Sequence, residues 1–279
     1  MKSKLIRNVL VFSILFVIAN GCNQQPAKNN SDEKAAAKVA QANDIEKIKS
    51  SVSNLIQSSP KGIDIINFLN EVGASFIFDL TLPVAAAEKF ETQTDLSLAL
   101  GVYGMDMLYA KTFNRQDAVV KTGEVMNQFI AKLGIREDLK SENNNFERLR
   151  LNESNKDSVD FYVNKIWNQF HAEIQAGKKP DIYALTFIGG NIEALYLLSQ
   201  LTLYAKDNQA MIDVLAKQGE LINTMKNLLE VFSQNEAILP YVNKFKPLFD
   251  YYVEHKTFTQ KELAEVAPII EAVRNEIIN

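Results

Sequence analysis

The sequence predicts an all-α fold, organised as an antiparallel helical bundle or a short α-solenoid of about eight or nine helices. Two observations predict it. Apolar residues recur at spacings of three and four along most of the chain after residue 44, as they do on one face of a helix. Seven Pro and eleven Gly are few for an all-β chain of 279 residues, which would need many turns. Bundle and solenoid both stay open, because no 34-residue helical repeat is legible.

Residues that stop helices divide this periodic pattern into segments. Ser58-Ser59-Pro60 ends the first segment, Gly134 is a C-cap, and Gly177 to Pro180 forms another break. The polar stretch 137–152, which contains three consecutive Asn residues, predicts a loop. The expected helices cover about 45–57, 60–81, 85–114, 118–134, 157–174, 182–205, 211–232, 235–255 and 260–278.

Two of the expected helices carry apolar residues on most sides and should therefore be central. The segment 85–114 has two apolar stripes, one through Leu96 and Leu100 and the other through Leu98 and Val102. The segment 182–205 is apolar nearly all round. The segment 211–232 steps alternately by four and three, so one continuous helix is expected to face it.

The first 43 residues predict where the protein is located in the cell, and they predict no folded domain. Residues 1–21 look like a signal peptide: three basic residues precede an apolar run of about eleven residues, whereas spanning a bilayer takes roughly 20. Ile18 to Cys22 resembles a bacterial lipobox, which implies a lipidated Cys22 at the start of the mature chain. Cys22 is the only Cys, so it has no internal disulfide partner. Ordinary cleavage beside an incidental Cys is the alternative.

Residues 22–43 are polar and Ala-rich and read as a flexible tether, which leaves 44–279 as a single helical domain. The expected location is the bacterial cell envelope, with the membrane as a partner through lipidated Cys22. Asn23 is not the Asp that retains some lipoproteins at the inner membrane, so the outer membrane is the expected site.

Composition and motifs exclude several functions. Without residues 1–21 the chain has 27 Lys and Arg against 34 Asp and Glu, a net charge of −7 that disfavours nucleic acid as a partner. The only histidines are His171 and His255, and HExxH, CxxC, GxSxG, P-loop and GxGxxG motifs are absent. No catalytic residue, metal ligand or cofactor is therefore predicted.

Two segments place glycines and then an acid in an apolar helix. Residues 101–109 hold Gly101, Gly104 and Asp106, and residues 187–196 hold two glycines and Glu193. One interpretation is close helix packing, with both acids hydrogen-bonded to Tyr, Asn or Gln. The other is a polar pocket for a small ligand. The residues predicted to line that pocket are Tyr103, Asp106, Tyr109, Glu193, Tyr196, Gln200 and Gln218.

The same segments resemble a family of uncharacterised helical lipoproteins of Bacteroidota. Leu100 to Tyr109 is similar to that family's LGVYGADLxY stretch, and Gly189 to Tyr196 to its GGWxEALY stretch, with Asn191 in place of Trp. The stretch 216–229 matches a third pattern in part, with Gly219 in place of Lys. The resemblance implies an envelope compartment and a helical fold, and it supplies no catalytic residue.

Three functions are compatible with these observations. The first is a non-enzymatic, membrane-anchored binding or scaffold protein that presents grooves between helices to a protein or peptide of the envelope. The second is a small-ligand binder that uses Asp106 and Glu193. The third is an enzyme with acid–base carboxylates. A deep pocket enclosing both acids would favour the second or third, and a closed core with an apolar groove would favour the first.

Overall fold

A computed structural model describes residues 45–135, 144–176 and 179–279, apart from the side chains of His171, Ile174 and Gln175. These residues belong to one compact unit, Asp44–Asn279. The predicted signal peptide, Cys22 and the tether all lie outside the described residues. Every regular element of the described residues is helical, which confirms the all-α class.

The described residues form a helix over 45–58 and ten further α-helices, so the predicted number of eight or nine was too low. Two short 3₁₀ helices, η1 (Phe78–Leu80) and η2 (Val84–Lys89), separate the second and third helices. The ten are α2 (Gly62–Glu71), α3 (Gln93–Thr112), α4 (Gln116–Lys132), α5 (Asn145–Leu151), α6 (Lys156–Ala176), α7 (Pro180–Tyr204), α8 (Gln209–Ala216), α9 (Gly219–Val231), α10 (Leu239–Glu254) and α11 (Gln260–Ile278).

Three differences from the expected helices have local causes. The helix expected over 60–81 ends at Glu71, because Gly73 adopts a φ of 74° and the Ala74 N–H bonds back to the Leu69 carbonyl, a Schellman-type stop. The helix expected from 85 begins at Gln93, where the Thr92 side chain caps it by accepting from the Asp95 N–H. Part of the loop expected over 137–152 forms α5, whose N-cap is Asn144.

The helix expected over 211–232 is interrupted at Gln218, between α8 and α9. The Gln218 N–H bonds to the Leu215 carbonyl three residues back, which is the tighter 3₁₀ pattern, and the α9 pattern then starts anew. The apolar spacing of the sequence continues through this bend, so periodicity alone did not reveal it.

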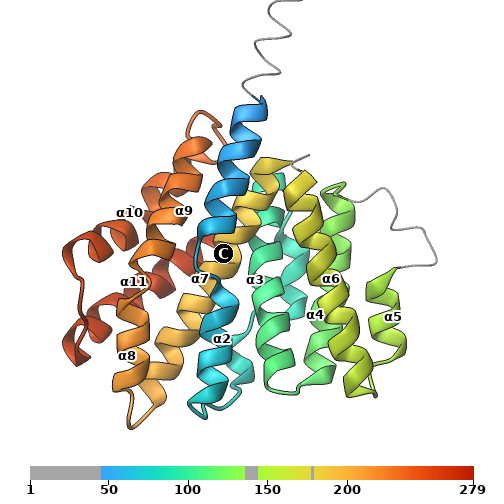
Figure 1. Ribbon diagram of the computed structural model, residues 1–279, viewed down its shortest axis with the longest axis horizontal. Helices are drawn as coiled ribbons and strands as arrows, with labels where there is room; N and C mark the ends of the chain where they lie inside the picture. Colours follow the sequence, from blue (N-terminus) through green and yellow to red (C-terminus); the bar gives the residue numbers. More distant parts are fainter. Residues whose placement is uncertain (1–44, 136–143, 177–178) are drawn as a thin grey trace, which may run out of the picture. The chain divides into compact units, whose positions relative to one another are not determined.

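The helices α3 and α7 form the centre of the arrangement, as the sequence predicted (Figure 1). In the view of Figure 1, α4, α5 and α6 lie on one side of them and α8 to α11 on the other, while α2 and the helix over 45–58 run across the front. The helix α7 is long and apolar enough to cross a membrane, yet 89% of its most apolar window is buried inside the protein. It is therefore the core helix of a helical, bundle-like fold.

Glycines bring the backbones of α3 and α7 into direct contact. A Cβ atom at Gly101 would lie 2.1 Å from the Thr186 carbonyl oxygen, and one at Gly189 would lie 2.0 Å from the Leu98 carbonyl oxygen. The prediction of close packing is confirmed at these two positions. It was wrong at Gly104, where an added Cβ would meet its nearest neighbour at an ordinary 3.5 Å.

Candidate functional site

The two acids of the glycine segments lie together in the core, and a cation from the last helix neutralises one of them. Asp106 on α3 is 2% exposed, Glu193 on α7 is fully buried, and Arg274 on α11 is 6% exposed. Arg274 donates from Nε to Glu193 Oε2 at 2.6 Å and from Nη2 to Glu193 Oε1 at 2.9 Å. Its Nη2 also donates to the Leu80 carbonyl at 3.2 Å. This bidentate, charge-assisted pair joins α7, α11 and η1.

Asp106 lies beside this ion pair, and its surroundings disfavour the charged carboxylate. Its Oδ2 accepts from the Leu82 N–H at 2.9 Å. Burial raises the pKa of Asp106 well above its ordinary value, and the Glu193 charge raises it further. No N–H or O–H group of the described residues donates to Asp106 Oδ1. A second negative charge beside Glu193 is therefore disfavoured at this position.

Burial also raises the pKa of Glu193, although the charge and hydrogen bonds of Arg274 oppose that shift. We assign the negative charge of the carboxyl pair to Glu193, because both of its oxygens accept from the guanidinium.

The tyrosines of the predicted pocket are engaged with backbone groups of the irregular segment before α3. The Tyr103 hydroxyl donates to the Pro83 carbonyl at 2.9 Å, and the Tyr109 hydroxyl donates to the Ser75 carbonyl at 3.2 Å while accepting from the Ile77 N–H at 2.9 Å. Burial raises the pKa of Tyr109 to about 12. The ring of Tyr196 lies 4.1 Å from the Arg274 guanidinium, a cation–π contact.

The structure thus brings five of the seven predicted residues into one buried cluster. The other two are Gln200, which is half-buried on α7, and Gln218, whose Nε2 donates to the Val214 carbonyl one turn back. The expectation that Tyr, Asn or Gln would pair with the acids was wrong, because their partners are Arg274 and a backbone N–H. The sequence contained a signal for Arg274, a basic residue within the apolar stripe of Ile270, Val273 and Ile277.

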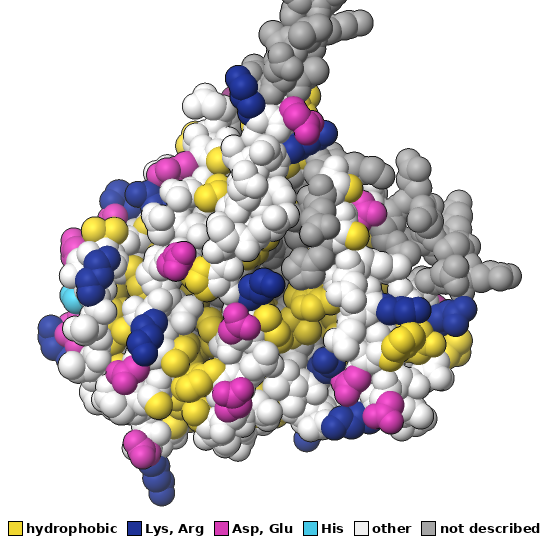
Figure 2. Space-filling model, viewed as in Figure 1, with side chains coloured by type: hydrophobic (Ala, Val, Ile, Leu, Met, Phe, Trp, Pro, Cys, Tyr) yellow, Lys and Arg dark blue, Asp and Glu magenta, His cyan; other side chains and the backbone are white. Residues whose placement is uncertain are grey.

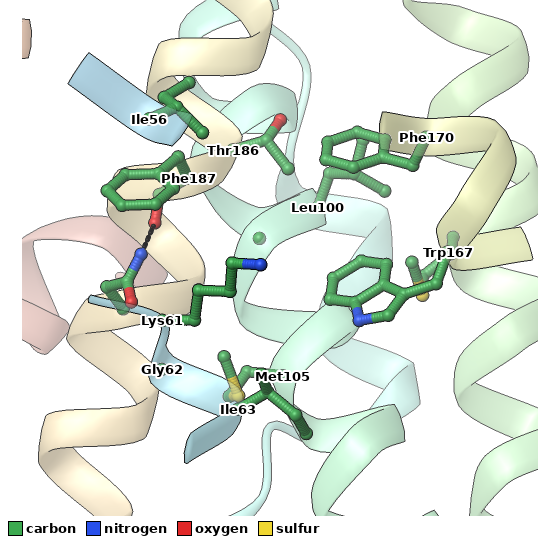
Figure 3. A pocket seen from close by; sticks show the side chains of 14 residues that line it. Ile56, Lys61, Gly62, Ile63, Leu100, Met105, Trp167, Phe170, Thr186 and Phe187 are labelled. Carbon is green, nitrogen blue, oxygen red and sulfur yellow. Dashed lines mark hydrogen bonds between the residues drawn. The ribbon is translucent and has the colours of Figure 1, made fainter. Parts of the chain in front are cut away.

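An open apolar pocket lies elsewhere on α3 and α7, where their backbones meet (Figure 3). It has a volume of about 90 Å³, and the bare backbones of Gly101 and Gly190 form part of its wall. Neither Asp106 nor Glu193 lines it. Its large apolar side chains come from the helix over 45–58, α2, α3, α4, α6 and α7: Ile56, Ile63, Leu100, Met105, Met126, Trp167, Phe170 and Phe187. Sequence reasoning did not find this pocket, because its walls come from segments far apart in the chain.

Three polar side chains interrupt this apolar lining, and one of them, Thr186, donates its hydroxyl to the Ile182 carbonyl at 2.8 Å. Lys61, the N-cap residue of α2, extends its side chain across the pocket (Figure 3) and pairs with no carboxylate of the described residues. Asn191 on α7 is 4% exposed, and its Nδ2 donates to the Phe187 carbonyl at 2.7 Å. Its Oδ1 is buried and accepts from no group of the described residues. The pocket thus offers one cation and one acceptor without partners of their own.

A second depression of about 130 Å³ adjoins the pocket and shares Met126, Trp167 and Phe170 with it. The rings of Trp167 and Phe170 are stacked, with centroids 5.8 Å apart, and separate the two hollows. Figure 2 shows hydrophobic side chains exposed in the middle of this face, over α2, α3 and α7, with charged side chains at their borders. This face therefore combines an accessible apolar surface with a polar rim, as binding surfaces do.

These features define a helical protein with a buried ion pair in its core and an open apolar pocket. No protein-family model, no curated protein and no solved structure matches the chain. Among the described residues, no group of three or more His, Cys, Asp or Glu could hold a metal ion. The resemblance to the Bacteroidota lipoproteins therefore stays a prediction, and we infer function from the pocket.

Proposed function

We propose that this chain is a non-enzymatic binding protein, anchored to a membrane through lipidated Cys22, that receives a protein or peptide partner in the apolar pocket between α2, α3, α6 and α7. One observation carries the proposal: the accessible concave surface at the α3–α7 crossing is apolar, whereas the paired acids are buried inside the core and line no part of it. A site built for acid–base chemistry needs a carboxyl group within reach of a substrate.

The energetics suit an anchoring site for one side chain of a larger partner. Burying a Val, Leu or Ile side chain contributes about 1.5–3 kcal/mol. That is too little for tight binding of a single small molecule, so further contacts on the surrounding face must contribute. We therefore place the partner among peptides and proteins, which can cover the pocket and its neighbouring depression together.

A second part of the proposal concerns the fold. We assign it as a bundle in preference to a solenoid, because α3 and α7 pack against each other and α11 contacts both of them, although 147 residues (113–259) separate α11 from α3. In a solenoid each repeat contacts only its neighbours in sequence. The small-ligand alternative at Asp106 and Glu193 remains a prediction, and the substitutions in the Discussion test it.

Photo-crosslinking in membranes of the source bacterium tests the proposed function. The residue p-benzoylphenylalanine replaces Phe187, which lines the pocket, and in a matched control it replaces Phe78, which is 62% exposed and does not line the pocket. We expect a discrete crosslinked species from position 187 alone, which disappears when Ile63→Trp fills the pocket. Identical products from both positions, or products that persist with Ile63→Trp, would count against the pocket as the binding site.

The anchor has its own test. Cys22→Ser should release the protein from the membrane fraction and remove the acyl mass from the mature amino terminus, and separation of inner from outer membranes should place the wild-type protein in the outer one. A Cys22→Ser protein that stays membrane-bound and is normally processed would refute the anchor without bearing on the pocket.

A further inference from the structure

The two unpartnered polar groups of the pocket indicate what its ligand must carry. Lys61 contributes an ammonium group without a carboxylate partner in the described residues, so it favours an anion. Asn191 Oδ1 is a buried acceptor without a donor, and leaving such a group unsatisfied is costly. A Cβ at Gly62 would lie 2.8 Å from this oxygen, so only a glycine at this position leaves room for the Asn191 side chain. The ligand should therefore supply both an anion and an N–H group.

The volume of the pocket limits the apolar part of the ligand. A cavity of about 150 Å³ accommodates a benzene molecule. At about 90 Å³ this pocket is smaller and suits a group of roughly four carbon atoms, such as the end of a Leu, Ile or Val side chain. A long acyl chain would leave most of its methylene groups in water, which argues against a fatty acid or a phospholipid tail.

We infer that the pocket binds the C-terminal residue of a peptide or protein chain, with a branched aliphatic side chain in the apolar hollow, the terminal carboxylate on Lys61 and the residue's own N–H on Asn191 Oδ1. An α-carboxylate, an N–H and a side chain diverge from one Cα atom, which matches a cation and an acceptor at the border of one small hollow. This inference deepens the proposed function and rests on it.

Two related ligands fit less well. A free amino acid carries an ammonium group in place of the amide N–H, and none of the residues that line the pocket is acidic. In an internal Leu-Asp sequence the carboxylate belongs to the next residue, whose side chain points away from that of Leu when the peptide is extended. A chain terminus places all three groups on a single residue.

Tryptophan fluorescence gives a direct measurement, because Trp167 is the only tryptophan of the chain and lines the pocket. The probes are acetyl-Gly-Gly-Leu with a free carboxylate, the same peptide as its C-terminal amide, and acetyl-Gly-Leu-Asp-Gly-amide, in which the acid is internal. We expect the free acid to bind with a Kd of about 1 mM, as suits a short peptide with one anchor, and roughly tenfold more tightly than either of the other two.

Two substitutions separate the two contacts. Lys61→Met should weaken the free acid to the affinity of the amide and leave the amide unchanged. Asn191→Leu should weaken both peptides by a similar factor of roughly 3 to 10, because both carry the leucine N–H. Lys206→Met is the matched control, since Lys206 is exposed and does not line the pocket, and it should leave all affinities unchanged. Circular dichroism checks that each variant stays folded.

The outcomes distinguish this inference from the proposed function. Equal binding of the acid and the amide, with both lost when Ile63→Trp fills the pocket, would overturn the terminal-carboxylate assignment and leave the pocket as a peptide site. Preference for the internal-acid peptide would likewise overturn it. Absence of any fluorescence change with all three peptides would refute the C-terminus assignment, while a crosslinked partner at position 187 would still support the broader function.

Discussion

Arg274→Met is expected to destabilise the protein strongly, because it leaves the Glu193 carboxylate buried without its cation. Glu193 is fully buried and accepts two hydrogen bonds from Arg274, at 2.6 and 2.9 Å, and the Leu80 carbonyl loses its contact with Arg274 as well. Removing one partner of a buried ion pair costs about 3–5 kcal/mol. For a domain of this size that corresponds to a decrease in Tm of roughly 6–20 °C.

Thermal and urea unfolding at pH 7, followed by circular dichroism, measure this effect. The double variant Glu193→Met with Arg274→Met is the control, because it removes both charges and keeps side chains of similar length. It should recover much of the lost free energy of unfolding, since replacing a buried pair by apolar residues is often close to neutral. An Arg274→Met protein within about 0.5 kcal/mol of wild type, the usual range of exposed substitutions, would show that the cluster does not stabilise the core.

Three further predictions concern the core. Asp106→Asn should keep near wild-type stability at pH 7, because the raised pKa of Asp106 favours its uncharged form and the uncharged amide can still accept from the Leu82 N–H. A large loss of stability would argue against a raised pKa. Because the pKa of Asp106 is raised in the folded protein, its contribution to the free energy of unfolding is complete below its ordinary pKa of about 4 and declines as the pH rises above that value. Asp106→Asn should therefore flatten the pH dependence of urea unfolding between pH 4 and 8. Gly189→Ala should lower the free energy of unfolding by several kcal/mol, since its Cβ would lie 2.0 Å from a carbonyl oxygen. The Cβ of Gly219→Ala meets nothing within 4 Å, so this variant should be more stable than wild type by up to about 1 kcal/mol. Equal Tm shifts in the two variants would contradict this prediction.

These substitutions also test the small-ligand alternative. If Asp106 and Glu193 bound a ligand, Asp106→Ala and Glu193→Ala would spare folding and abolish binding. The hydrogen bonds of both acids predict the reverse, a loss of stability in each variant. A Glu193→Ala protein with unchanged Tm would favour the hypothesis that Asp106 and Glu193 bind a small ligand.

Local patterns in the sequence were sufficient for the parts of the fold that local physics decides. The apolar stripes around Leu98 and Leu100 predicted a buried central helix, and the paired glycines predicted the backbone contact at Gly101 and Gly189. Gly73 was a signal for the end of α2, but the helical spacing of the apolar residues around it favoured a longer helix.

The partners of the acids and the walls of the pocket could not be read in the same way. Arg274 is 81 residues from Glu193, and a single sequence contains no measure of which distant side chains meet. The pocket likewise combines Lys61, Trp167 and Asn191 from three separate helices or their ends, and none of these residues is unusual in its own segment. Only the packing of α3 against α7 shows that the acids face inward while the glycines border an open hollow.

The central claim is that a peptide group enters the pocket at the α3–α7 crossing, and methyl NMR of methionine tests it most directly. Met105 and Met126 line the pocket, whereas Met211 and Met225 are buried in α8 and α9 and do not line it. Titration with acetyl-Gly-Gly-Leu should shift the first two methyl resonances and leave the other two in place. Shifts confined to Met211 and Met225, or equal shifts at all four, would show that the peptide binds elsewhere.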